Sequence, residues 1–527
     1  MSLANAPLPT DPDDLRTFAE LLQAEVHAKT LHIEKLKAQL AALRRARFGR
    51  SSEALDREIR QLELLLGAPA DDGAERPMAA AKGGDDKPAA SGRAERKPGG
   101  RQPLPAHLPR ETVVHEPACT CPVCGSARLT RIGEDRREVL EYVPSYFKVI
   151  VHVRPKVSCR ACETITQEPM PSLPIERGRP GPALLAHVLV AKYCDHSPLN
   201  RQSGIYRRAG VDIDRGTMVG WVGQFAFLAE PVWQGIARHV RAGPALHADD
   251  TPVPVLDPGR GRTKTGRLWV LVRDERPWGS TAPPAVVYRY SPDRKGEHAK
   301  VLLDGCRGFL HADAYAGFND LYAPHPATGQ PIIEPVACWS HARRQIYEVH
   351  ADTASPLAQE ALERMAQLFA IEATINGNTP DVRLAVRQKQ SVPLLAGLKA
   401  FLDDALTRIS AKSTLAKAIR YALVRWTALV RYTTDGRLEM TNNAAERAIR
   451  PLALGRKNWL FAGADSGGER AAMMYTIIQT AVLNGLDPEA YLRDLAARIA
   501  DHPINRIDEL LPWEWARRNG QHDKVAA

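Results

Sequence analysis

Apolar residues near the start of the chain recur with the spacing of a heptad. The core positions of this repeat hold Leu15, Leu22, Leu36 and Leu43 on one side, and Ala19, Val26, Ile33 and Leu40 on the other. Lys29 interrupts the seam, but successive heptads of this kind are typical of a coiled coil. We therefore predict a coiled coil, or leucine zipper, over residues 12–68 and self-association through it.

The segment after the heptads argues against a helix packed onto its own domain. Residues 69–110 are rich in Ala, Gly, Pro and charge, which is the composition of a basic flexible linker. Such a linker offers no apolar surface that could bury the stripe. A cationic cluster at 44–50, which contains Arg47 and Arg50, is either a solvated charge run or a contact to the DNA backbone.

Short apolar runs in the second half of the chain predict a mixed α/β sheet. Strands are expected at 245–256, 268–273 and 285–290, then just before Asp313, and finally at 336–339. A helix is expected over 294–303. Three strands, a helix and then further strands separated by helices indicate a mixed sheet, which we place within residues 240–465.

Between the linker and the mixed sheet, three helices joined by tight turns are predicted, at 182–193, 198–209 and 214–227. Gly210 ends the second helix, and Asp214 and Thr217 can cap the third. A unit of this kind over 180–230 is compatible with a helix-turn-helix DNA reader. Its candidate DNA contacts are Arg201, Arg207 and Arg208. A small bundle that only packs domains together gives the same pattern.

Length and charge limit the class of protein. A chain of 527 residues is too long for one core, so three or four domains are expected. Lys and Arg number 71 against 61 Asp and Glu, which leaves a net charge of +10 and suits a polyanionic partner. The chain has no apolar run long enough to span a membrane and no signal-peptide pattern, so we expect a soluble cytoplasmic protein.

Cysteines cluster in one region of the chain. Two Cys-x-x-Cys pairs, Cys121 with Cys124 and Cys159 with Cys162, are separated by a strand-like stretch at 146–157. Two such turns can present four thiolates to one tetrahedral zinc ion, and the interval 159 − 124 = 35 suits a β-hairpin. We predict a structural zinc ribbon over 111–175, with Cys119 and His115 as reserve ligands.

Acidic residues interrupt two of the predicted strands. Asp249 and Asp250 lie inside the apolar strand at 245–256, and Asp313 ends another. Buried carboxylates are costly unless they are paired or bind a cation, and hard oxygen ligands select Mg²⁺ or Mn²⁺. Together with Glu446 on a later helix they could hold two ions, as in phosphodiester cleavage and transfer. Capping of a turn is the competing role for Asp250 or Asp313.

Basic residues surround Glu446, which lies on a short helix between the asparagine pair at 442–443 and Pro451. These residues are Arg447, Arg450, Arg456 and Lys457. A surface ion-pair patch would be energetically minor. The alternative is a site that handles phosphate, in which Glu446 is a metal ligand and the cations contact DNA.

Four motifs together resemble the transposase of the insertion sequence 66 family. They are His247-Ala248-Asp249-Asp250-Thr251-Pro252-Val253, His311-Ala312-Asp313-Ala314-Tyr315-Ala316-Gly317, Cys338-Trp339-Ser340-His341-Ala342-Arg343-Arg344 and the stretch from Asn442 to Pro451. The stretch from Leu454 to Gly463, the zipper, the cluster at 44–50 and the cysteine pairs fit the same family. The resemblance therefore covers nearly the whole chain.

This resemblance implies a DNA transposase with an RNase H-like fold and a DDE triad at Asp249, Asp313 and Glu446. The family usually has Asp-Glu-Thr where this chain has Asp249-Asp250-Thr251, so we keep Asp249 as the catalytic residue. His341 and Arg344 are expected to line the site and Cys338 and Trp339 to pack in the core. Arg343 and Arg344 are also candidate DNA contacts.

The interval 446 − 313 = 133 predicts a helical insertion at about 350–432, supported by Leu394, Leu398, Leu402 and Leu406. A C-terminal helical segment is expected over 466–515. The fold class is thus multidomain α+β: a coiled coil, a zinc ribbon, a helical DNA-binding unit and an RNase H-like catalytic core.

We expect such a protein to cleave insertion-sequence ends and to join the 3′-OH to target DNA, using two Mg²⁺ or Mn²⁺ ions beside the structural Zn²⁺. Its partners would be DNA, a second copy of the chain and accessory transposition proteins, in the nucleoid-associated cytoplasm of a bacterium. Two alternatives stay open. One is a zinc-containing DNA-binding regulator, and the other is a structure-specific nuclease of the same fold without strand transfer.

Overall fold

The computed structural model describes residues 104–519 apart from 105, 107, 118–119, 121–123, 144–145, 176–177, 258, 260, 314, 325–328 and 330. The chain divides into two units, Met1–Pro98 and Gly99–Ala527, and every described residue belongs to the second. The coiled coil predicted at 12–68, with Arg47 and Arg50, therefore lies outside the described residues, as does most of the predicted linker.

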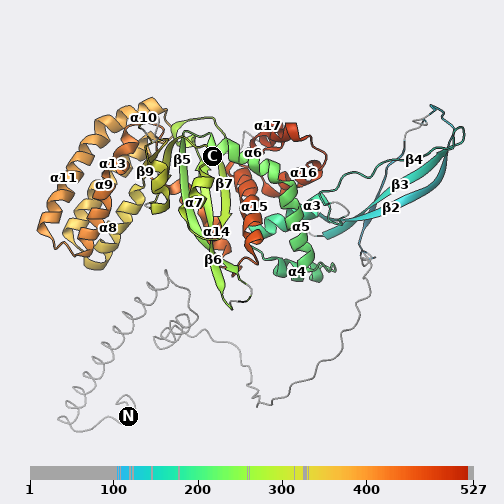
Figure 1. The fold of residues 1–527 in the computed structure, drawn as a ribbon, viewed down its shortest axis with the longest axis horizontal. Coiled ribbons are helices and arrows are strands. Elements are labelled where there is room, and N and C mark those ends of the chain that lie inside the picture. The colour runs from blue at the N-terminus through green and yellow to red at the C-terminus, as the bar shows by residue number, and fades with distance from the viewer. Residues whose placement is uncertain are drawn as a thin grey trace, which may run out of the picture. The chain divides into compact units, whose positions relative to one another are not determined.

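A long antiparallel hairpin forms the first part of the described chain (Figure 1). Its two arms pair from Leu129 with Cys159 to Val143 with Tyr146, with one register shift between Arg131 and Gly133. The side chains of one arm alternate between buried and half-buried positions, because successive residues of a strand face opposite sides. The sheet comprises β1 (Arg110–Val114), β2 (Leu129–Val143), β3 (Tyr146–Cys159) and β4 (Ile165–Gln167), in the order β1-β3-β2 with β4 paired to β3.

The hairpin is joined to the helices that follow by a buried carboxylate. Glu141 on β2 accepts a hydrogen bond of 2.7 Å from the backbone N–H of Leu184, close to the start of α3 (Pro182–Tyr193). Leu140 also exchanges backbone hydrogen bonds with Arg179 and Gly181. These contacts satisfy the open N-terminal turn of the helix and fix the base of the hairpin.

The three predicted helices form within one or two residues of their expected bounds. They are α3, α4 (Leu199–Arg208) and α5 (Arg215–Leu228), and α6 (Glu230–Arg241) follows. Asp214 caps α5 as expected, because its carboxylate accepts from the N–H of Gly216 at 2.6 Å. Gly210 follows α4 with φ of +79°, a conformation that favours glycine.

A five-stranded mixed sheet lies at the centre of this unit (Figure 1). The strand order is β7-β6-β5-β8-β9, in which β5, β6 and β7 pair antiparallel, while β5, β8 and β9 pair parallel. The mixed α/β prediction is confirmed. The strands are β5 (Ala245–Leu256), β6 (Thr263–Arg273), β7 (Ala285–Ser291), β8 (Gly308–Ala312) and β9 (Ile333–Ala337), with helix α7 (Gly296–Leu302) between β7 and β8 and short helices η2 (Arg276–Trp278) and η3 (Ala316–Tyr322).

The expected last strand at 336–339 is wrong in its bounds. Strand β9 ends at Ala337, and Trp339 already begins α8 (Trp339–Thr353). The indole of Trp339 is fully buried and donates to the carbonyl of Leu429 at 2.8 Å. The apolar character of Cys338 and Trp339 therefore reflects burial at the start of a helix and not a continuing strand.

The free edge of the five-stranded sheet at β7 is covered by α15 (Asp465–Leu483). The hydroxyl of Thr476 accepts from the N–H of Tyr288 at 2.9 Å. The hydroxyl of Thr480 accepts from the N–H of Val286 at 3.2 Å and donates to its carbonyl at 3.1 Å. Side-chain hydroxyls thus satisfy the backbone groups that an edge strand would leave exposed.

Helices between β9 and Glu446 form a block with its own apolar core. This block packs beyond β9, at the opposite end of the strand order from α15 (Figure 1). Its elements are α8, α9 (Pro356–Ile375), α10 (Pro380–Val386), the π-helical turn η4 (Arg387–Ser391), α11 (Val392–Arg408), α12 (Thr414–Val424), α13 (Trp426–Val430) and η5 (Arg431–Thr433).

The remaining helices complete the described chain. They are α14 (Asn443–Gly455), α15, α16 (Pro488–Arg498), η6 (Ile504–Leu510) and α17 (Pro512–Arg518). Among the described residues, no helix combines the length and the apolar character that crossing a membrane requires.

Candidate active site and zinc site

Asp249 and Asp313 lie at matching positions on two neighbouring parallel strands. Strands β5 and β8 pair with His247 opposite His311, and each aspartate follows two residues later in the chain. The offset is the same for both pairs, since 311 − 247 = 64 and 313 − 249 = 64. The fold thus brings both carboxylates to the same level of the sheet, where β8 ends and β5 continues.

The site opens here because β8 ends at Ala312 while β5 continues to Leu256. Beyond Asp249, the side of β5 that faces away from β6 contacts the segment around Ala462, whose carbonyl accepts from the N–H of Leu256 at 2.8 Å. Even-numbered residues of β5 therefore point their nitrogens away from β6. Pro252 and Pro254 occupy two of these positions, where a missing N–H costs no hydrogen bond with β6.

Two stacked histidines form the layer beneath the aspartates. The rings of His247 and His311 lie 4.2 Å apart between centroids, and both side chains are buried. Burial lowers the pKa of His247 to about 4 and that of His311 to about 3, so both rings are neutral. His311 Nε2 accepts from the N–H of Glu439 at 3.0 Å and its Nδ1 donates to the carbonyl of Leu246 at 3.1 Å.

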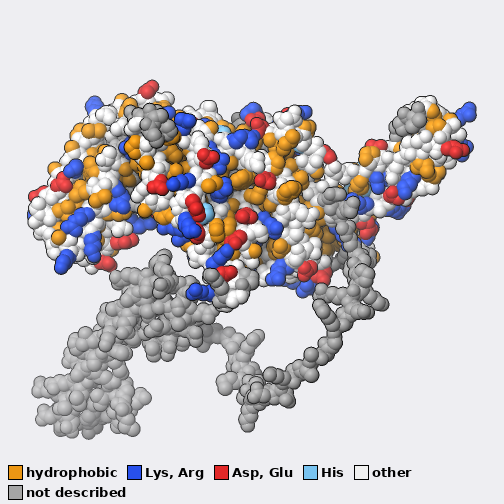
Figure 2. All heavy atoms as spheres, in the orientation of Figure 1, with side chains coloured by type: hydrophobic (Ala, Val, Ile, Leu, Met, Phe, Trp, Pro, Cys, Tyr) orange, Lys and Arg blue, Asp and Glu red, His pale blue; other side chains and the backbone are white. Residues whose placement is uncertain are grey.

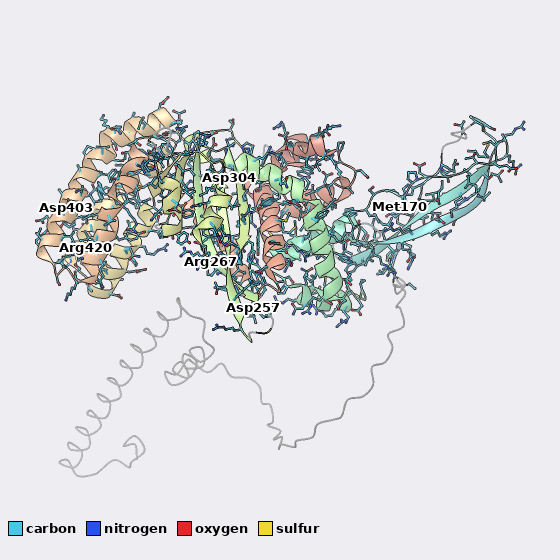
Figure 3. All side chains as sticks on the ribbon, in the orientation of Figure 1. Met170, Asp257, Arg267, Asp304, Asp403 and Arg420 are labelled. Carbon is cyan, nitrogen blue, oxygen red and sulfur yellow. The ribbon has the colours of Figure 1, made fainter. Side chains whose placement is uncertain are left out.

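Asp250 is committed to an ion-pair network and is not available as a free ligand. Its carboxylate is 2% exposed and lies 3.0 Å from Arg267 Nη1 and 2.7 Å from Arg294 Nη2. Arg267 comes from β6 (Figure 3), and Arg294 also stacks on the ring of Tyr315, 4.1 Å from its centroid. Asp250 therefore ties β5 to β6 and to the loop after Asp313, while Asp249 carries no ion pair among the described residues.

Glu446 is positioned by the asparagine at the start of its helix. Asn442 is fully buried. Its Nδ2 donates to the carbonyl of Ala248 at 2.9 Å, and its Oδ1 accepts from Nδ1 of His247 at 3.2 Å. One side chain therefore fixes the N-terminus of α14 against the residue that precedes Asp249.

The carboxylate of Glu446 faces α8. It lies 3.6 Å from His341 Nε2 and 3.9 Å from Arg344 Nη2, so its ion partners are on α8 and not among the cations of its own helix. Its Oε1 is buried and has no hydrogen-bond partner among the described residues. The thiol of Cys338 and then the charge of Glu446 raise the pKa of His341.

The structure brings Asp249 and Asp313 together but leaves Glu446 apart from them. Among the described residues, one group of possible metal ligands joins Glu446 to His341 and Cys338 within 4.8 Å, and neither aspartate belongs to it. A single Mg²⁺, with bonds of about 2.0–2.1 Å, needs ligand atoms closer together than this arrangement gives. Two ions about 3.5–4 Å apart spread the ligands more widely.

The clustered negative charges of the aspartates favour binding of a cation. Burial, together with the nearby carboxylates of Asp313 and Asp250, raises the pKa of Asp249 to about 7. Clustered carboxylates of this kind are stable as anions only with a compensating positive charge. The buried Oε1 of Glu446 has no hydrogen-bond partner among the described residues, so it is also open to a ligand. A cavity of about 510 Å³ opens beside Asp313, lined also by Tyr315, Tyr421 and Arg425.

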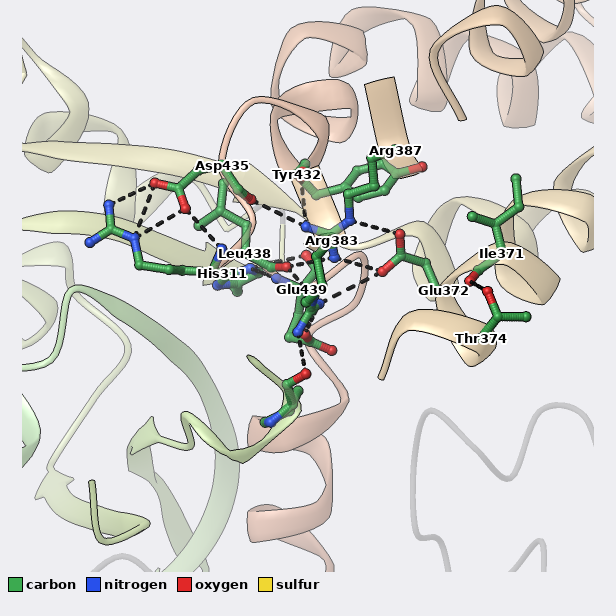
Figure 4. Close-up of polar contacts among 12 residues, drawn as sticks. His311, Ile371, Glu372, Thr374, Arg383, Arg387, Tyr432, Asp435, Leu438 and Glu439 are labelled. Atoms are coloured by element: carbon green, nitrogen blue, oxygen red, sulfur yellow. Dashed lines mark hydrogen bonds and ion pairs between the residues drawn. The ribbon is translucent and has the colours of Figure 1, made fainter. Parts of the chain in front are cut away.

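A buried network of arginines links the helical block to this site (Figure 4). Arg387 binds Glu372 with two hydrogen bonds, of 2.8 and 2.6 Å, and also binds the carbonyl of Tyr432 at 2.9 Å. Arg383 binds the carboxylate of Glu439, whose N–H reaches His311. The helices between β9 and α14 therefore support the histidine that lies under Asp313.

Three of the four predicted zinc ligands gather at one end of the hairpin. Cys124 Sγ lies 3.3 Å from Cys162 Sγ and 3.7 Å from Cys159 Sγ. These separations fit the edges of a tetrahedral thiolate site, which are about 3.8 Å for zinc–sulfur bonds of about 2.3 Å. Backbone N–H groups of Ala161 and Cys162 lower the pKa of the Cys159 thiol, which favours its thiolate.

The other candidate zinc ligands are Cys121, Cys119 and His115. Cys121 and Cys119 lie outside the described residues. His115 pairs instead with His152, Nε2 to Nδ1 at 3.1 Å with stacked rings.

The candidate DNA-binding residues are mostly exposed. Arg201, Arg343, Arg344, Arg447, Arg450 and Lys457 lie on the surface. Arg207 pairs with Asp212, Arg208 binds the carbonyl of Gly204, and Arg456 binds the carbonyl of Pro252. On the face seen in Figure 2, basic and acidic side chains of the described residues are interspersed, so charge alone does not mark a DNA path there.

Sequence reasoning missed two kinds of supporting residue. His247 and His311 carry a signal, because the triplet His-Ala-Asp occurs twice, at 247–249 and 311–313. Arg383 and Arg387 carry none, since their partners are distant in sequence. Cys338 and Trp339 are buried as expected.

Comparison with known proteins gives the same order of parts. The family model described as "Transposase IS66 family" matches residues 177–470. Three further models match: "zinc-finger binding domain of transposase IS66" at 118–163, "IS66 C-terminal element" at 476–513 and "Transposase C of IS166 homeodomain" at 35–113.

Two uncharacterized proteins of Sinorhizobium fredii (strain NBRC 101917 / NGR234) are similar over most of their length. The protein y4hP is 42% identical over 512 residues, which are 95% of this chain and 91% of y4hP. The protein y4jD is 37% identical over 507 residues, which are 94% of this chain and 97% of y4jD.

Proposed function

The chain belongs to the IS66 family of transposases, and from this premise we propose that it cleaves the ends of an insertion sequence and joins each freed 3′-OH to target DNA. The observation that carries the proposal is the shared register of Asp249 and Asp313, each two residues beyond the paired His247 and His311 of two neighbouring parallel strands. The strand order, three antiparallel strands followed by two parallel ones with β5 at the centre, supports an RNase H-like core.

We assign the triad to Asp249, Asp313 and Glu446. Asp249 is preferred over Asp250 because the two arginines already neutralise Asp250. Glu446 is the third member because Asn442 anchors its helix beside Asp249 and because its buried Oε1 has no hydrogen-bond partner among the described residues. Two divalent ions, Mg²⁺ or Mn²⁺, held by these acids would activate the attacking oxygen and stabilise the leaving one.

The remaining residues of the site act on substrate position and charge. His341 and Arg344 are close enough to Glu446 to orient its carboxylate before substrate binds. Exposed cations beside it, Arg447, Arg450 and Lys457, would contact flanking phosphates. In the first step water breaks a P–O bond and leaves a 3′-OH. In the second, this hydroxyl attacks a target phosphodiester and a target 3′-oxygen leaves, so the number of phosphodiester bonds is conserved.

The other parts of the chain would organise the DNA. We propose that the thiol group of Cys124, Cys159 and Cys162, completed by Cys121, holds a structural zinc. The helical unit at α3 to α5 would contact DNA through Arg201, Arg207 and Arg208, and residues 12–68 would pair two copies of the chain, with Arg47 and Arg50 near the DNA backbone.

The test is an assay on a supercoiled plasmid that carries the two ends of the element. Wild-type protein with Mg²⁺ should nick the ends and form joint molecules with a second plasmid, and Asp313→Asn should do neither while it still binds DNA. Asp304→Asn, the same change at an exposed position of the sheet domain, is the matched control. Near-normal joining by Asp313→Asn would refute the triad.

The same assay separates the alternative functions. Cleavage without joint molecules would indicate a nuclease, and binding without any Mg²⁺-dependent cleavage would indicate a regulator.

A further inference from the structure

A second cavity lies away from the catalytic acids. It measures about 370 Å³ and is enclosed by α3, α5, the outer parts of β5 and β6, and the segment that leads into α15. Neither aspartate of the triad nor Glu446 lines it. Its volume lies within the range of small-molecule sites, about 300–1,000 Å³.

Aromatic side chains form one wall of this cavity. Tyr193, Trp459, Phe461 and Tyr475 line it, and the rings of Tyr193 and Tyr475 meet edge to face at 5.2 Å. Phe461 remains 42% exposed although it lies at the cavity. Flat, partly exposed aromatic groups are the surfaces on which nucleic-acid bases stack.

Two positively charged side chains also line this cavity. Lys192 and Arg470 line it, and neither has an ion pair with an acid among the described residues. Lys192 stands over the ring of Tyr193, 5.0 Å from its centroid. Burial lowers the pKa of Lys192 to about 8 because no carboxylate compensates its ammonium group. Lys192 is half-buried, and a desolvated cation without a neighbouring carboxylate is costly, so an anionic ligand would relieve this cost.

The start of α15 adds a backbone donor beside these cations. Ser466, Gly467 and Gly468 line the cavity at the first turn of a 19-residue helix. The N–H groups of Gly467 and Gly468 already bond the carbonyl of Ala464, so the donor offered to a ligand is the N–H of Ser466, which has no backbone acceptor among the described residues. Ala464 at the N-cap has no side chain that could accept from the first N–H groups. The carboxylate of Asp465 is turned to Lys264, at 2.6 Å, and does not cap the helix. Such a helix start, next to Lys192 and Arg470, favours a phosphate.

We propose that this cavity binds one unpaired nucleotide of a DNA strand, with the base against the aromatic wall and the phosphate at Lys192, Arg470 and the start of α15. The identification of DNA as the source rests on the proposed function. Val253 lines the cavity four residues after Asp249 on β5, so the two sites are separated by about 13 Å along the strand. That is about four nucleotides of a stacked strand, and Arg456, bound to the carbonyl of Pro252, lies between them.

This site also gives a role to the motif from Leu454 to Gly463, which the triad leaves unexplained. Trp459, Phe461 and Gly463 of that motif line the cavity, and the N–H of Ala462 donates to the carbonyl of Pro254 at 2.8 Å. The motif therefore attaches the aromatic wall to the same strand that carries Asp249.

The experiment compares two fluorescent duplexes of equal length, one blunt and one with three unpaired nucleotides at an end. Binding of the full chain is measured by anisotropy without added Mg²⁺ or Mn²⁺, so that no cleavage is needed. We expect wild type to prefer the unpaired end by roughly tenfold, because one base stacks on an aromatic side chain. Lys192→Met and Val219→Trp, which fills the cavity from α5, should both reduce this ratio to about one.

Matched controls make the same two substitutions, lysine to methionine and valine to tryptophan, at exposed positions outside the cavity. Lys417→Met deletes an exposed lysine of α12, and Val382→Trp enlarges a valine of α10 that is 46% exposed, close to the 43% of Val219. Both should keep the wild-type ratio. If Val219→Trp lowers the melting temperature, Lys192→Met decides the question, since loss of an unpaired, half-buried charge should not destabilise the fold.

The outcomes distinguish the possible ligands. A ratio of one for wild type, or a preference that survives both cavity variants, overturns the proposal. Calorimetric titration with dAMP and dTMP tests whether the cavity instead binds free nucleotides. If Lys192→Met abolishes such binding while wild type binds the blunt and the unpaired-end duplexes equally well, the ligand is a free nucleotide and the DNA strand is overturned as its ligand. A chain that prefers unpaired ends but never cleaves would refute the proposed function and leave this site intact.

Discussion

Replacement of Asn442 by alanine tests whether the start of α14 is fixed to the catalytic strand. Asn442 is fully buried and joins α14 to β5 through the carbonyl of Ala248 and the ring of His247. Without it both groups stay buried and lose their partner. Each unsatisfied group costs about 1–3 kcal/mol, so we expect Asn442→Ala to lower the free energy of unfolding by about 2–5 kcal/mol.

Asn442→Ala should also slow cleavage by protein that is still folded. Glu446 lies one helical turn after Asn442, and a displacement of about 1 Å in a catalytic group can reduce the rate roughly a hundredfold. We therefore expect Asn442→Ala to lose about two orders of magnitude in end cleavage at a temperature at which the variant is folded. Thermal melting and a single-turnover cleavage assay measure the two effects separately.

Asn484→Ala is the matched control for this prediction. Asn484 also donates two hydrogen bonds from its side chain, to the carbonyls of Pro284 and Thr480 at 2.8 Å each, but at the far end of α15. It should lower the melting temperature and leave cleavage by the folded protein unchanged. If the two variants cleave at the same rate, the asparagine does not position Glu446 and the argument fails.

Three further predictions follow from the described contacts. Asp250→Asn should destabilise the protein by about 2–3 kcal/mol, because two arginines lose their buried partner, whereas Asp249→Asn should abolish cleavage without that loss; equal stability of both variants in thermal melts would contradict the distinction. Cys159→Ser should release zinc, measured by a colorimetric chelator, and expose the hairpin end to limited proteolysis; retention of one zinc per chain would count against the ligand set. Thr480→Val should cost about 1–3 kcal/mol, because the backbone of Val286 loses both hydrogen bonds, and should leave cleavage by folded protein intact, so loss of cleavage at full folding would show that the edge contact has another role.

Local patterns predicted the elements that carry their own signal. The strand at 245–256 has the observed bounds of β5, and the helix at 182–193 has those of α3. These segments are apolar runs ended by clear turn or cap residues, so the residues themselves define their limits. The bounds of β9 were wrong because burial at a helix start looks the same as a strand in sequence.

Contacts between distant residues could not be predicted in this way. The central position of β5 depends on pairing with β8, across the whole of β6, β7 and α7. Asn442 reads as a turn residue until its contacts with Ala248 and His247 are known. The same holds for Arg383 and Arg387, which resemble exposed helix positions in sequence but are fully buried because Glu372 and the segment at 432–439 surround them.

The length of the hairpin that carries the cysteines sets a fixed distance between its two ends. Its base is fixed where Leu140 and Glu141 meet the start of α3, and β2 pairs with β3 from there back to Leu129, opposite Cys159, with one register shift between Arg131 and Gly133. Eleven residue steps of about 3.3 Å give an arm of about 36 Å, which is about one turn of B-form DNA. If the helices around α3 contact a duplex as proposed, an arm of this length would reach the same side of that duplex one full turn away. The spacing between two DNA contacts would then be set by the number of residues in a strand, so that deleting one cross-strand pair from each arm would shorten the reach by about 3 Å, close to the rise of one base pair.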